Sequence, residues 1–236
     1  YHIDKDFYPL GSCTMKYNPK INEVIANIDG FKNLHPEQPI ETVQGAMELI
    51  YELESMLKKI TGMARCTLQP SAGAQGELAG AMVIKKYHTC KDNDKNVILV
   101  PDSAHGTNTA TVVRVGYKTR VISSDSRGRV DIDDLKDKID SNVAGLMLTQ
   151  PNTLGLFEDN IQEITKIVHD VDGLVYMDGA NLNALVGIAK PGNFGPDVCH
   201  INLHKTFCIP HGGGGPGMGP IACKRHLQVY LPNHPV

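Results

Sequence analysis

Apolar and polar positions alternate from about Asn96 onward in a way that predicts a parallel α/β sheet. Short apolar runs typical of buried strands recur there, and amphipathic stretches separate them. The strand candidates are residues 97–100, 120–122, 145–149, 174–177, 200–203 and 221–223. Because strands that alternate with helices pack as layers, the pattern favours a mostly parallel central sheet flanked by helices.

The helix candidates lie on both sides of Asn96. Residues 41–61 carry apolar side chains at helical spacing, and residues 73–87 form another candidate, entered through a turn rich in Gly and Ala. Asp131 is placed to cap a later helix, because a carboxylate can accept hydrogen bonds from the free N–H groups of a first turn. Residues 160–171 complete the set with an apolar face at helical spacing.

The first forty residues differ from the rest of the chain. Their prolines, at positions 9, 19, 36 and 39, predict an extended arm with at most short helices. We therefore expect an N-terminal arm over residues 1–40 and one large ligand-binding domain over residues 41–236. Because the chain begins at Tyr1 without Met and stops at Val236 with no visible closing element, we expect it to be part of a longer protein.

Composition and charge exclude several classes of function. The 236 residues are 41% hydrophobic and 21% charged, which is typical of a globular protein. The net charge of −3 argues against binding to nucleic acid or to an anionic membrane. We find no apolar run long enough to cross a bilayer and no secretory signal. The 6 cysteines are scattered without CxxC spacing, so we expect reduced thiols in a cytosol-like compartment.

Polar residues follow the strand candidates at one edge of the predicted sheet. In an open parallel sheet, ligands bind just beyond the carboxyl ends of the strands. The residues that follow these ends are Asp102, Ser103, His105, Asn152, Thr153, Asp178, Asn181, His204 and Lys205. The sequence therefore predicts a binding site at this edge.

Lys205 and Asp178 carry the most specific chemistry. A lysine just past a buried strand loses part of its hydration, which favours the neutral amine that forms a Schiff base. A lone loop lysine is otherwise most often an ordinary surface residue. Asp178 ends an apolar run, where a carboxylate needs a partner such as a pyridinium nitrogen. The alternatives for Asp178 are a helix cap or a metal ligand.

Two further features complete a possible cofactor site. The small residues of 70–77 stand at the entrance of a helix, where free N–H groups can hold a phosphate, although Ser71 alone is equally well explained as a plain N-cap. His105 is suited to stacking on a planar cofactor, or is an ordinary histidine. Together the residues supply what pyridoxal 5′-phosphate requires: a phosphate cup, a carboxylate for the ring nitrogen, a stacking ring and an amine.

The glycine-rich run at residues 212–219 contains the spacing of a dinucleotide-binding fingerprint. We reject that interpretation, because the fingerprint needs a strand before it and a helix after it, whereas the apolar run 220–223 follows here. The glycines favour a close approach of the backbone to a cofactor or to another chain.

Several blocks of the chain together resemble one enzyme family. The blocks are GSCTMK at 11–16, the turn at 71–77, SAHGTN at 103–108, MDGAN at 177–181, and LHKTF at 203–207 with the run to Gly219. They resemble the P-proteins, the glycine decarboxylases of the glycine cleavage system, almost end to end. The matching half is the one that carries the cofactor lysine. The fold implied is α/β, the fold type I (aspartate aminotransferase-like) large domain of pyridoxal-phosphate enzymes, without the small C-terminal domain.

The resemblance also implies roles for individual residues. Lys205 would hold pyridoxal 5′-phosphate as a Schiff base, Asp178 would pair with its ring nitrogen, and His105 would stack on its ring. The other implied cofactor-binding positions are Ser71, Gly73, Ala74, Gln75, Thr153, Asn181 and His204. One departure from the family is Thr109, where Pro is usual; it loosens a turn beside His105 without removing a functional group.

An activity and partners follow from the same resemblance. Glycine would form an aldimine with the cofactor and lose CO₂, and its aminomethyl group would pass to the lipoyl arm of H-protein. The expected partners are the N-terminal half of the enzyme (subunit 1 where the halves are separate) and lipoylated H-protein, in a homo- or hetero-oligomer. The expected compartment is the bacterial cytoplasm, or the mitochondrion for a fused chain. Alone, the chain is expected to bind cofactor weakly and to turn over poorly.

Other interpretations of these residues stay open. A cysteine desulfurase or an amino-acid decarboxylase of the same fold would keep Lys205, although no long loop carries Cys199 or Cys208. A non-catalytic scaffold half would make Lys205 dispensable. A metal-dependent hydrolase is disfavoured and no metal is expected, because the available ligands fit no standard zinc spacing. Those ligands are His200, His204, His211 and Asp178.

Overall fold

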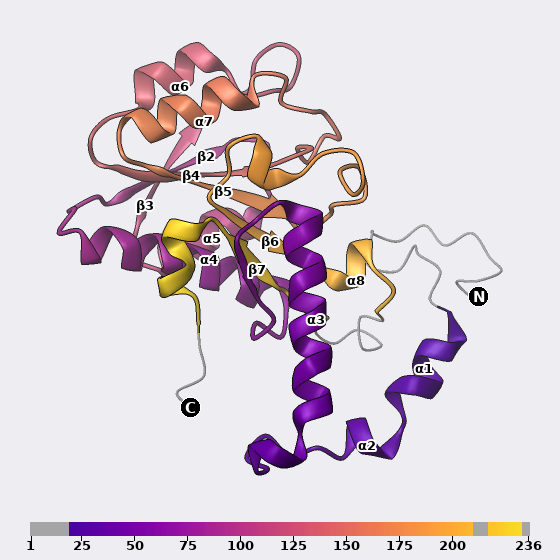
Figure 1. Cartoon of the computed structure of the whole chain (residues 1–236). Helices are drawn as coiled ribbons and strands as arrows, with labels where there is room; N and C mark the ends of the chain where they lie inside the picture. Colours follow the sequence, from indigo (N-terminus) through magenta and orange to yellow (C-terminus); the bar gives the residue numbers. More distant parts are fainter. Residues whose placement is uncertain (1–18, 210–216, 233–236) are drawn as a thin grey trace.

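The computed structural model describes residues 19–209 and 217–232, which form a sheet with helices on both faces (Figure 1). The strands are β1 (Arg65–Thr67), β2 (Val97–Pro101), β3 (Lys118–Ile122), β4 (Val143–Thr149), β5 (Leu174–Gly179), β6 (Val198–Ile201) and β7 (Ile221–Cys223). Their order across the 7-stranded sheet is β1-β7-β6-β5-β4-β2-β3. The strands from β6 to β3 are parallel, and only β7 and β1 add antiparallel pairs. The predicted mostly parallel sheet is confirmed.

Helices precede, connect and follow these strands. The α-helices are α1 (Lys20–Ala26), α2 (Asp29–Lys32), α3 (Gln44–Thr61), α4 (Gly73–Cys90), α5 (Gly106–Arg114), α6 (Ile132–Lys138), α7 (Ile161–Asp170) and α8 (Leu203–Thr206). Short 3-10 helices are η1 (Ile40–Thr42), η2 (Pro191–Asn193) and η3 (Arg225–Tyr230). The predicted cap of α6 is confirmed, because the Asp131 carboxylate accepts from the N–H groups of Asp133 and Asp134.

The core lies in two layers, one on each face of the sheet. On one face, Ile84 of α4 packs in a buried cluster with Met147 and Tyr176. On the other face, Ile164 of α7 packs in a cluster with Leu146. Neighbouring residues of β4 enter different layers because side chains alternate along a strand. Both layers are fully buried at these positions, so the strand ends are held in a fixed arrangement.

The structure corrects several predicted boundaries. Strand 200–203 ends earlier than predicted, because the chain turns at Asn202 and Leu203 begins α8. Helix 41–61 is divided at Val43, which separates η1 from α3. β1 and α5 were not predicted, since three residues give β1 no alternation to detect and α5 carries threonines among its apolar residues.

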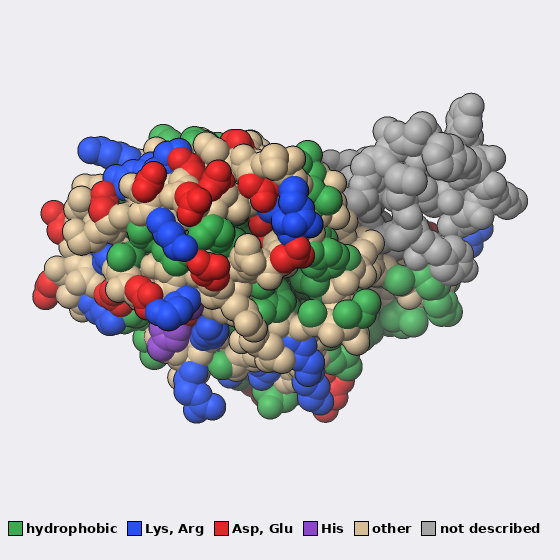
Figure 2. All heavy atoms as spheres, turned by 90° about the horizontal axis from the view of Figure 1, so that it is seen from above, with side chains coloured by type: hydrophobic (Ala, Val, Ile, Leu, Met, Phe, Trp, Pro, Cys, Tyr) green, Lys and Arg blue, Asp and Glu red, His purple; other side chains and the backbone are tan. Residues whose placement is uncertain are grey.

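Part of the predicted arm is described, and α1 and α2 are the short helices expected there. Residues 1–18 lie outside the described residues, so the boundary at residue 40 stays a prediction. No described helix is long and apolar enough to span a membrane. On the face of the molecule shown in Figure 2, acidic and basic side chains are interspersed, in keeping with the small net charge.

Every cysteine within the described residues has a free thiol, as predicted. Cys66, Cys199 and Cys223 are buried, whereas Cys90 and Cys208 are exposed. Burial raises the pKa of Cys66 and of Cys223 to about 12. Because the thiolate is the reactive form, these buried thiols are unreactive near neutral pH.

Asp197 lies at the amino ends of β5 and β6, at the other end of the strands from the polar residues expected above, and stabilises the sheet there. The residue is 2% exposed, and its Oδ2 accepts from Val175 N at 2.9 Å and lies 2.7 Å from His169 Nε2. Burial raises the pKa of Asp197, but His169, the Val175 N–H group and Lys224 outweigh it, so the net pKa is lowered.

We expect Asp197→Asn to lower the free energy of unfolding by about 1.5–3 kcal/mol, the worth of hydrogen bonds to a charged group. Because the folded pKa lies below the unfolded value, this stabilisation is present above the unfolded pKa and is lost as the pH falls through the folded one. Urea unfolding at neutral and acidic pH measures both effects. Equal stability of the variant and the wild type at neutral pH would contradict the prediction.

Candidate functional site

A cavity of about 420 Å³ opens at the carboxyl ends of β4, β5 and β6. Its wall is formed by Gly73, Ala74, Glu77, His105, Thr107, Thr149, Pro151, Asn152, Thr153, Gly155, Asp178, Ala180, Asn181, His200, Asn202 and Lys205. The structure therefore brings together most of the residues expected at this edge. It does so because parallel strands place their carboxyl ends side by side.

Asp178 lies at the inner end of the cavity, near the end of β5. The residue is 6% exposed, and its Oδ1 accepts from Ala180 N at 2.9 Å. Oδ2 accepts from Asn108 Nδ2 at 3.2 Å, and Nδ1 of His200 lies 3.5 Å from Oδ1. Burial raises the pKa of Asp178, but these neighbours and Lys205 outweigh burial and lower the net pKa. A buried carboxylate is thus kept ionised, facing a cavity.

Lys205 reaches the same cavity from α8, which follows β6 after one residue. The turn at Asn202 is closed by the Lys205 N–H group, which donates to the Asn202 carbonyl at 3.1 Å. Thr206 Oγ1 accepts from Leu182 N at 2.9 Å, which fixes α8 to the loop after β5. Lys205 is half-buried, and its charge helps to lower the pKa of Asp178. Among the described residues of the cavity wall, Lys205 carries the only side-chain amine, and this amine lies within electrostatic reach of the buried carboxylate.

The first turn of α4 forms another part of the wall through Gly73 and Ala74. Gly219 N donates to Pro70 O at 3.1 Å, and a Cβ at Gly219 would overlap the Ala72 carbonyl. A Cβ at Gly76 would likewise overlap the Gly219 carbonyl. The described end of the glycine-rich segment thus makes a close backbone approach, as predicted. Its neighbour is the start of α4 in the same chain, whereas a cofactor or another chain was expected. Residues 210–216 lie outside the described residues.

Ser71 and Gln75 stand at the entrance of α4 but do not line the cavity. Ser71 Oγ donates to Gln75 Oε1 at 2.6 Å, and Ser71 N donates to the same oxygen at 3.0 Å. Ser71 is not the N-cap, because α4 begins after Ala72, which makes no side-chain cap. The two residues brace the turn that presents Gly73.

His105 is the N-cap of α5 and lines the cavity. Its Nδ1 lies 2.7 Å from Thr107 Oγ1. Across the cavity mouth, Thr153 Oγ1 donates to the Ser103 carbonyl, so the loops after β2 and β4 are tied together. Asn181 completes this rim as an exposed residue of the cavity wall. Asp102, also expected there, instead accepts from Ser124 N at 3.1 Å and does not line the cavity.

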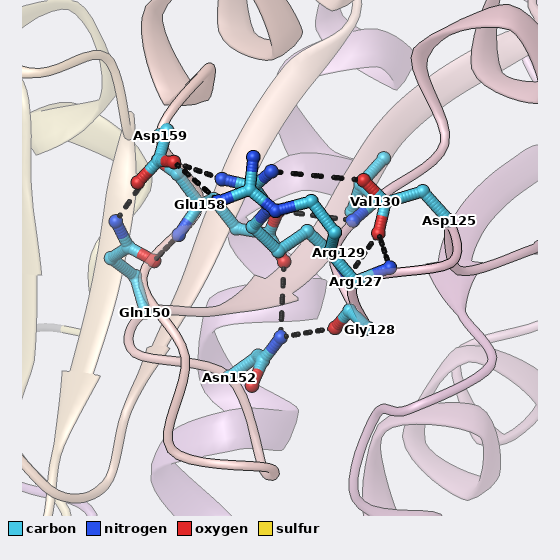
Figure 3. A network of polar contacts seen from close by, with 9 residues as sticks. All are labelled: Asp125, Arg127, Gly128, Arg129, Val130, Gln150, Asn152, Glu158 and Asp159. Atoms are coloured by element: carbon cyan, nitrogen blue, oxygen red, sulfur yellow. Dashed lines mark hydrogen bonds and ion pairs between the residues drawn. The ribbon is translucent and has the colours of Figure 1, made fainter.

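A polar network behind the wall holds the loop that carries Asn152 and Thr153 (Figure 3). Glu158 Oε2 accepts from Val130 N at 3.0 Å, and Oε1 accepts from Asn152 Nδ2 at 3.3 Å. Burial raises the pKa of Glu158, partly offset by Val130, Asn152 and Arg129. Glu158 does not line the cavity itself. It positions the wall indirectly, because it holds Asn152, which does line the cavity.

His204, one of the expected cofactor ligands, is 3% exposed and is not part of the wall. The His204 ring packs against Gly217, where a Cβ would overlap it, so His204 contacts the chain around Gly217. The described residues contain no group of three or more His, Cys, Asp or Glu side chains placed to hold a metal ion. His211, considered above as a metal ligand, lies outside the described residues.

Several residues of the site were not predicted, among them Glu77, Thr107, Asn108 and Asn202. Glu77 follows Gly73 by four residues, so a helix starting at Gly73 places both on one face, which is a usable signal. Thr107 and Asn108 depend on α5, which was not predicted. Asn202 was hidden inside the predicted strand 200–203.

Three comparisons relate the chain to known proteins. The family model for the glycine cleavage system P-protein matches residues 3–236. The chain is 59% identical over 232 residues to a probable glycine dehydrogenase (decarboxylating) subunit 2 of Prosthecochloris aestuarii. It is 58% identical over 233 residues to the protein of the same name from Caldanaerobacter subterraneus. In both cases 98% of this chain is covered but only 48% of the relative, so the chain spans about half the length of these curated relatives.

Solved structures share the fold. A glycine decarboxylase (P-protein) in inhibitor-bound form superposes with a TM-score of 0.76 at 22% identity, over 93% of this chain and 48% of that one. An aromatic aminotransferase from Pyrococcus horikoshii gives a TM-score of 0.60 at 19% identity, over 78% of this chain and 51% of that one. The predicted fold type I architecture is therefore confirmed. By sequence, the chain belongs to the glycine cleavage system P-protein family, whose cofactor is pyridoxal 5′-phosphate.

Proposed function

We propose that this chain is the cofactor-bearing half of a glycine decarboxylase and that the cavity at the carboxyl ends of the strands is its active site. One observation carries the proposal: Lys205, the ionised Asp178 and the first turn of α4 line a single cavity. Its volume of about 420 Å³ lies within the range of small-molecule sites.

The residues present fit pyridoxal 5′-phosphate. Gly73 and Ala74 bring to the wall the start of α4, where N–H groups lack partners within the helix and the helix dipole favours an anion. Asp178 is a buried carboxylate that suits a cationic ring nitrogen. Lys205 supplies the amine through which the cofactor is attached.

Within the site, each residue has a distinct task. Bound there, pyridoxal 5′-phosphate supplies the electron sink that makes loss of CO₂ from glycine possible. Asp178 would stabilise positive charge on the ring nitrogen, because it is a buried carboxylate whose pKa is lowered. Lys205 would hold the cofactor through its amine and could return a proton to the cavity. His105 lies at the mouth of the same cavity, where it can cover the ring.

Titration of the purified chain with pyridoxal 5′-phosphate, followed by absorption spectroscopy, tests the proposal. We expect a new visible band, and borohydride reduction with peptide mapping should place the label on Lys205. The affinity should be weak for this chain alone and should rise when the other half of the enzyme is added. A label on another lysine, or no band even with the other half present, would contradict the proposal.

The names and lengths of the relatives support a subunit 1 partner. Those relatives are called subunit 2 and are about twice as long as this chain, so the complete enzyme includes a subunit 1 and sequence beyond this chain. The aminomethyl group would pass to lipoylated H-protein, in a homo- or hetero-oligomeric enzyme. Since the curated relatives compared above are bacterial, the cytoplasm is the proposed compartment.

The competing enzymatic hypothesis, a cysteine desulfurase, gains no support from the site. Cys199 is fully buried in β6, and burial raises its pKa. Cys208 is exposed but is not part of the cavity wall. Neither described thiol near Lys205 is placed to carry sulfur into the cavity.

A further inference from the structure

Glu77, a buried carboxylate of α4, joins two sides of the cavity. It is 3% exposed and lines the wall. Its Oε1 accepts from Asn108 Nδ2 at 3.1 Å, and its Oε2 accepts from Thr107 Oγ1 at 2.9 Å. The same Asn108 nitrogen donates to Asp178, and the same Thr107 oxygen lies 2.7 Å from His105 Nδ1. One intermediary therefore separates Glu77 from each of these two site residues.

The position of the Thr107 proton decides how His105 is protonated. The hydroxyl carries one proton but has two possible acceptors, Glu77 Oε2 and His105 Nδ1. If the proton points to Glu77, Nδ1 must hold a proton of its own and donate it to Oγ1. If it points to His105, an ionised Glu77 oxygen faces the hydroxyl oxygen with no proton between them. A buried carboxylate oxygen left without its donor costs more than a neutral nitrogen, so the first arrangement is favoured.

The backbone of Thr107 offers His105 Nδ1 a competing donor. Thr107 N donates to Nδ1 at 3.2 Å, which is the N-cap hydrogen bond of α5, and this contact is longer than the 2.7 Å between Nδ1 and the hydroxyl oxygen. A proton on Nδ1 replaces this cap, because a protonated ring nitrogen cannot accept. This N–H group belongs to the first turn of α5, and Thr107 is an exposed residue. Glu77 is a buried residue whereas Thr107 is exposed, so giving up the longer amide contact costs less than leaving the Glu77 oxygen without its donor.

We propose that Glu77 is a positioning residue that keeps a proton on His105 Nδ1 through Thr107 and holds Asp178 through Asn108. In the neutral ring, Nε2 then carries the lone pair, so His105 presents a proton acceptor rather than a donor at that nitrogen. The significance of this arrangement rests on the proposed function of the cavity. The proton position itself is a property of the chain without cofactor, so it can be tested independently.

Glu77→Gln is the sharpest test, because it keeps the size of the side chain and removes one acceptor. The Gln oxygen is expected to accept from Asn108, and its NH₂ group to donate to Thr107 Oγ1. The hydroxyl proton of Thr107 then turns to His105 Nδ1, and the ring proton moves to Nε2. Nitrogen-15 NMR of the cofactor-free chain with labelled histidine rings, at alkaline pH, distinguishes these two tautomers. The His105 signals are assigned by their loss in His105→Gln.

We expect an Nδ1 proton in the wild type and an Nε2 proton in Glu77→Gln. Thr107→Val should also give the Nε2 tautomer, because Nδ1 is then left with the backbone N–H group alone; this exposed substitution provides the test if Glu77→Gln does not fold. Thr107→Ser and Glu163→Gln, the latter an exposed residue of α7, should keep the wild-type tautomer.

Two results would overturn the inference. An Nε2 proton already present in the wild type and unchanged in Glu77→Gln would mean that Nδ1 is an acceptor from the start, as in the N-cap hydrogen bond from Thr107 N, and that Glu77 does not set the tautomer. An Nδ1 proton that survives both Glu77→Gln and Thr107→Val would mean that the chain of contacts does not govern His105. If the tautomer switches as expected but the wild type binds no pyridoxal 5′-phosphate even with the other half present, the proposed function fails and the inference stands.

Discussion

Lys205→Ala is expected to abolish covalent attachment of pyridoxal 5′-phosphate and to lower glycine decarboxylation on the order of 10³-fold or more, because the nucleophilic amine is lost. Lys205 is the only lysine among the described residues of the cavity wall. The measurement is borohydride trapping with peptide mapping, together with release of labelled CO₂ from glycine in the enzyme assembled with its other half and H-protein.

Two variants control for the loss of charge and for nonspecific effects. Lys205→Arg keeps a cation near Asp178 but forms no bond to the cofactor, so trapping should fail while noncovalent binding persists. Lys86→Ala, an exposed lysine of α4, should trap cofactor as the wild type does. Decarboxylation by Lys205→Ala at the wild-type rate would support the scaffold hypothesis instead, in which this lysine is dispensable.

Asp178→Asn should weaken decarboxylation by about 10²–10³-fold, the usual loss when one preorganised electrostatic partner is removed from an active site. The side chain keeps its size, so the contacts with Asn108 and Ala180 are largely retained. Because the pKa of Asp178 is lowered, its carboxylate stays ionised through neutral pH, and its own titration lies below the ordinary Asp range. Cofactor affinity should therefore fall at acidic pH in the wild type and show no such carboxylate-dependent fall in Asp178→Asn.

The readouts for Asp178 are the dissociation constant of pyridoxal 5′-phosphate, measured by absorption, and the rate of CO₂ release. Asp170→Asn serves as the matched control, since Asp170 lies on α7 and is paired with Lys166 outside the cavity. Thermal unfolding of both variants separates loss of binding from loss of fold. An Asp178→Asn enzyme with unchanged affinity and rate would remove this residue from the ring-nitrogen role.

The predictable parts of the fold are those in which apolar spacing has a single explanation. β2, β4 and β5 are buried along their lengths, and continuous apolar runs identify them. The cap at Asp131 was equally predictable, because its carboxylate accepts hydrogen bonds from residues only two and three positions further along the chain. By contrast, β1 exists because it pairs with β7, more than 150 residues away, and no local pattern records such a partner.

The residues that follow the strands could be predicted as site residues, whereas the helix residues that support them could not. Lys205, Asp178 and His105 follow strand candidates, so topology alone brings them to one edge. Glu77 and Asn108 lie on helices and enter the site through hydrogen bonds to other side chains, which depend on the orientation of α4 and α5. His204 shows the opposite error, since its neighbour Lys205 lines the cavity whereas His204 points into packing with Gly217.

The order of the strands has a consequence for how the protein can be followed in solution. The cavity joins Gly73, which precedes β2, to Lys205, which follows β6, so almost the whole sheet must be assembled before its wall is complete. Partly folded chains therefore lack the site, and a ligand that binds only the native state shifts the folding equilibrium by mass action. The colour of a bound cofactor would then serve as an optical reporter of folding of the entire sheet, and not merely of events around one lysine.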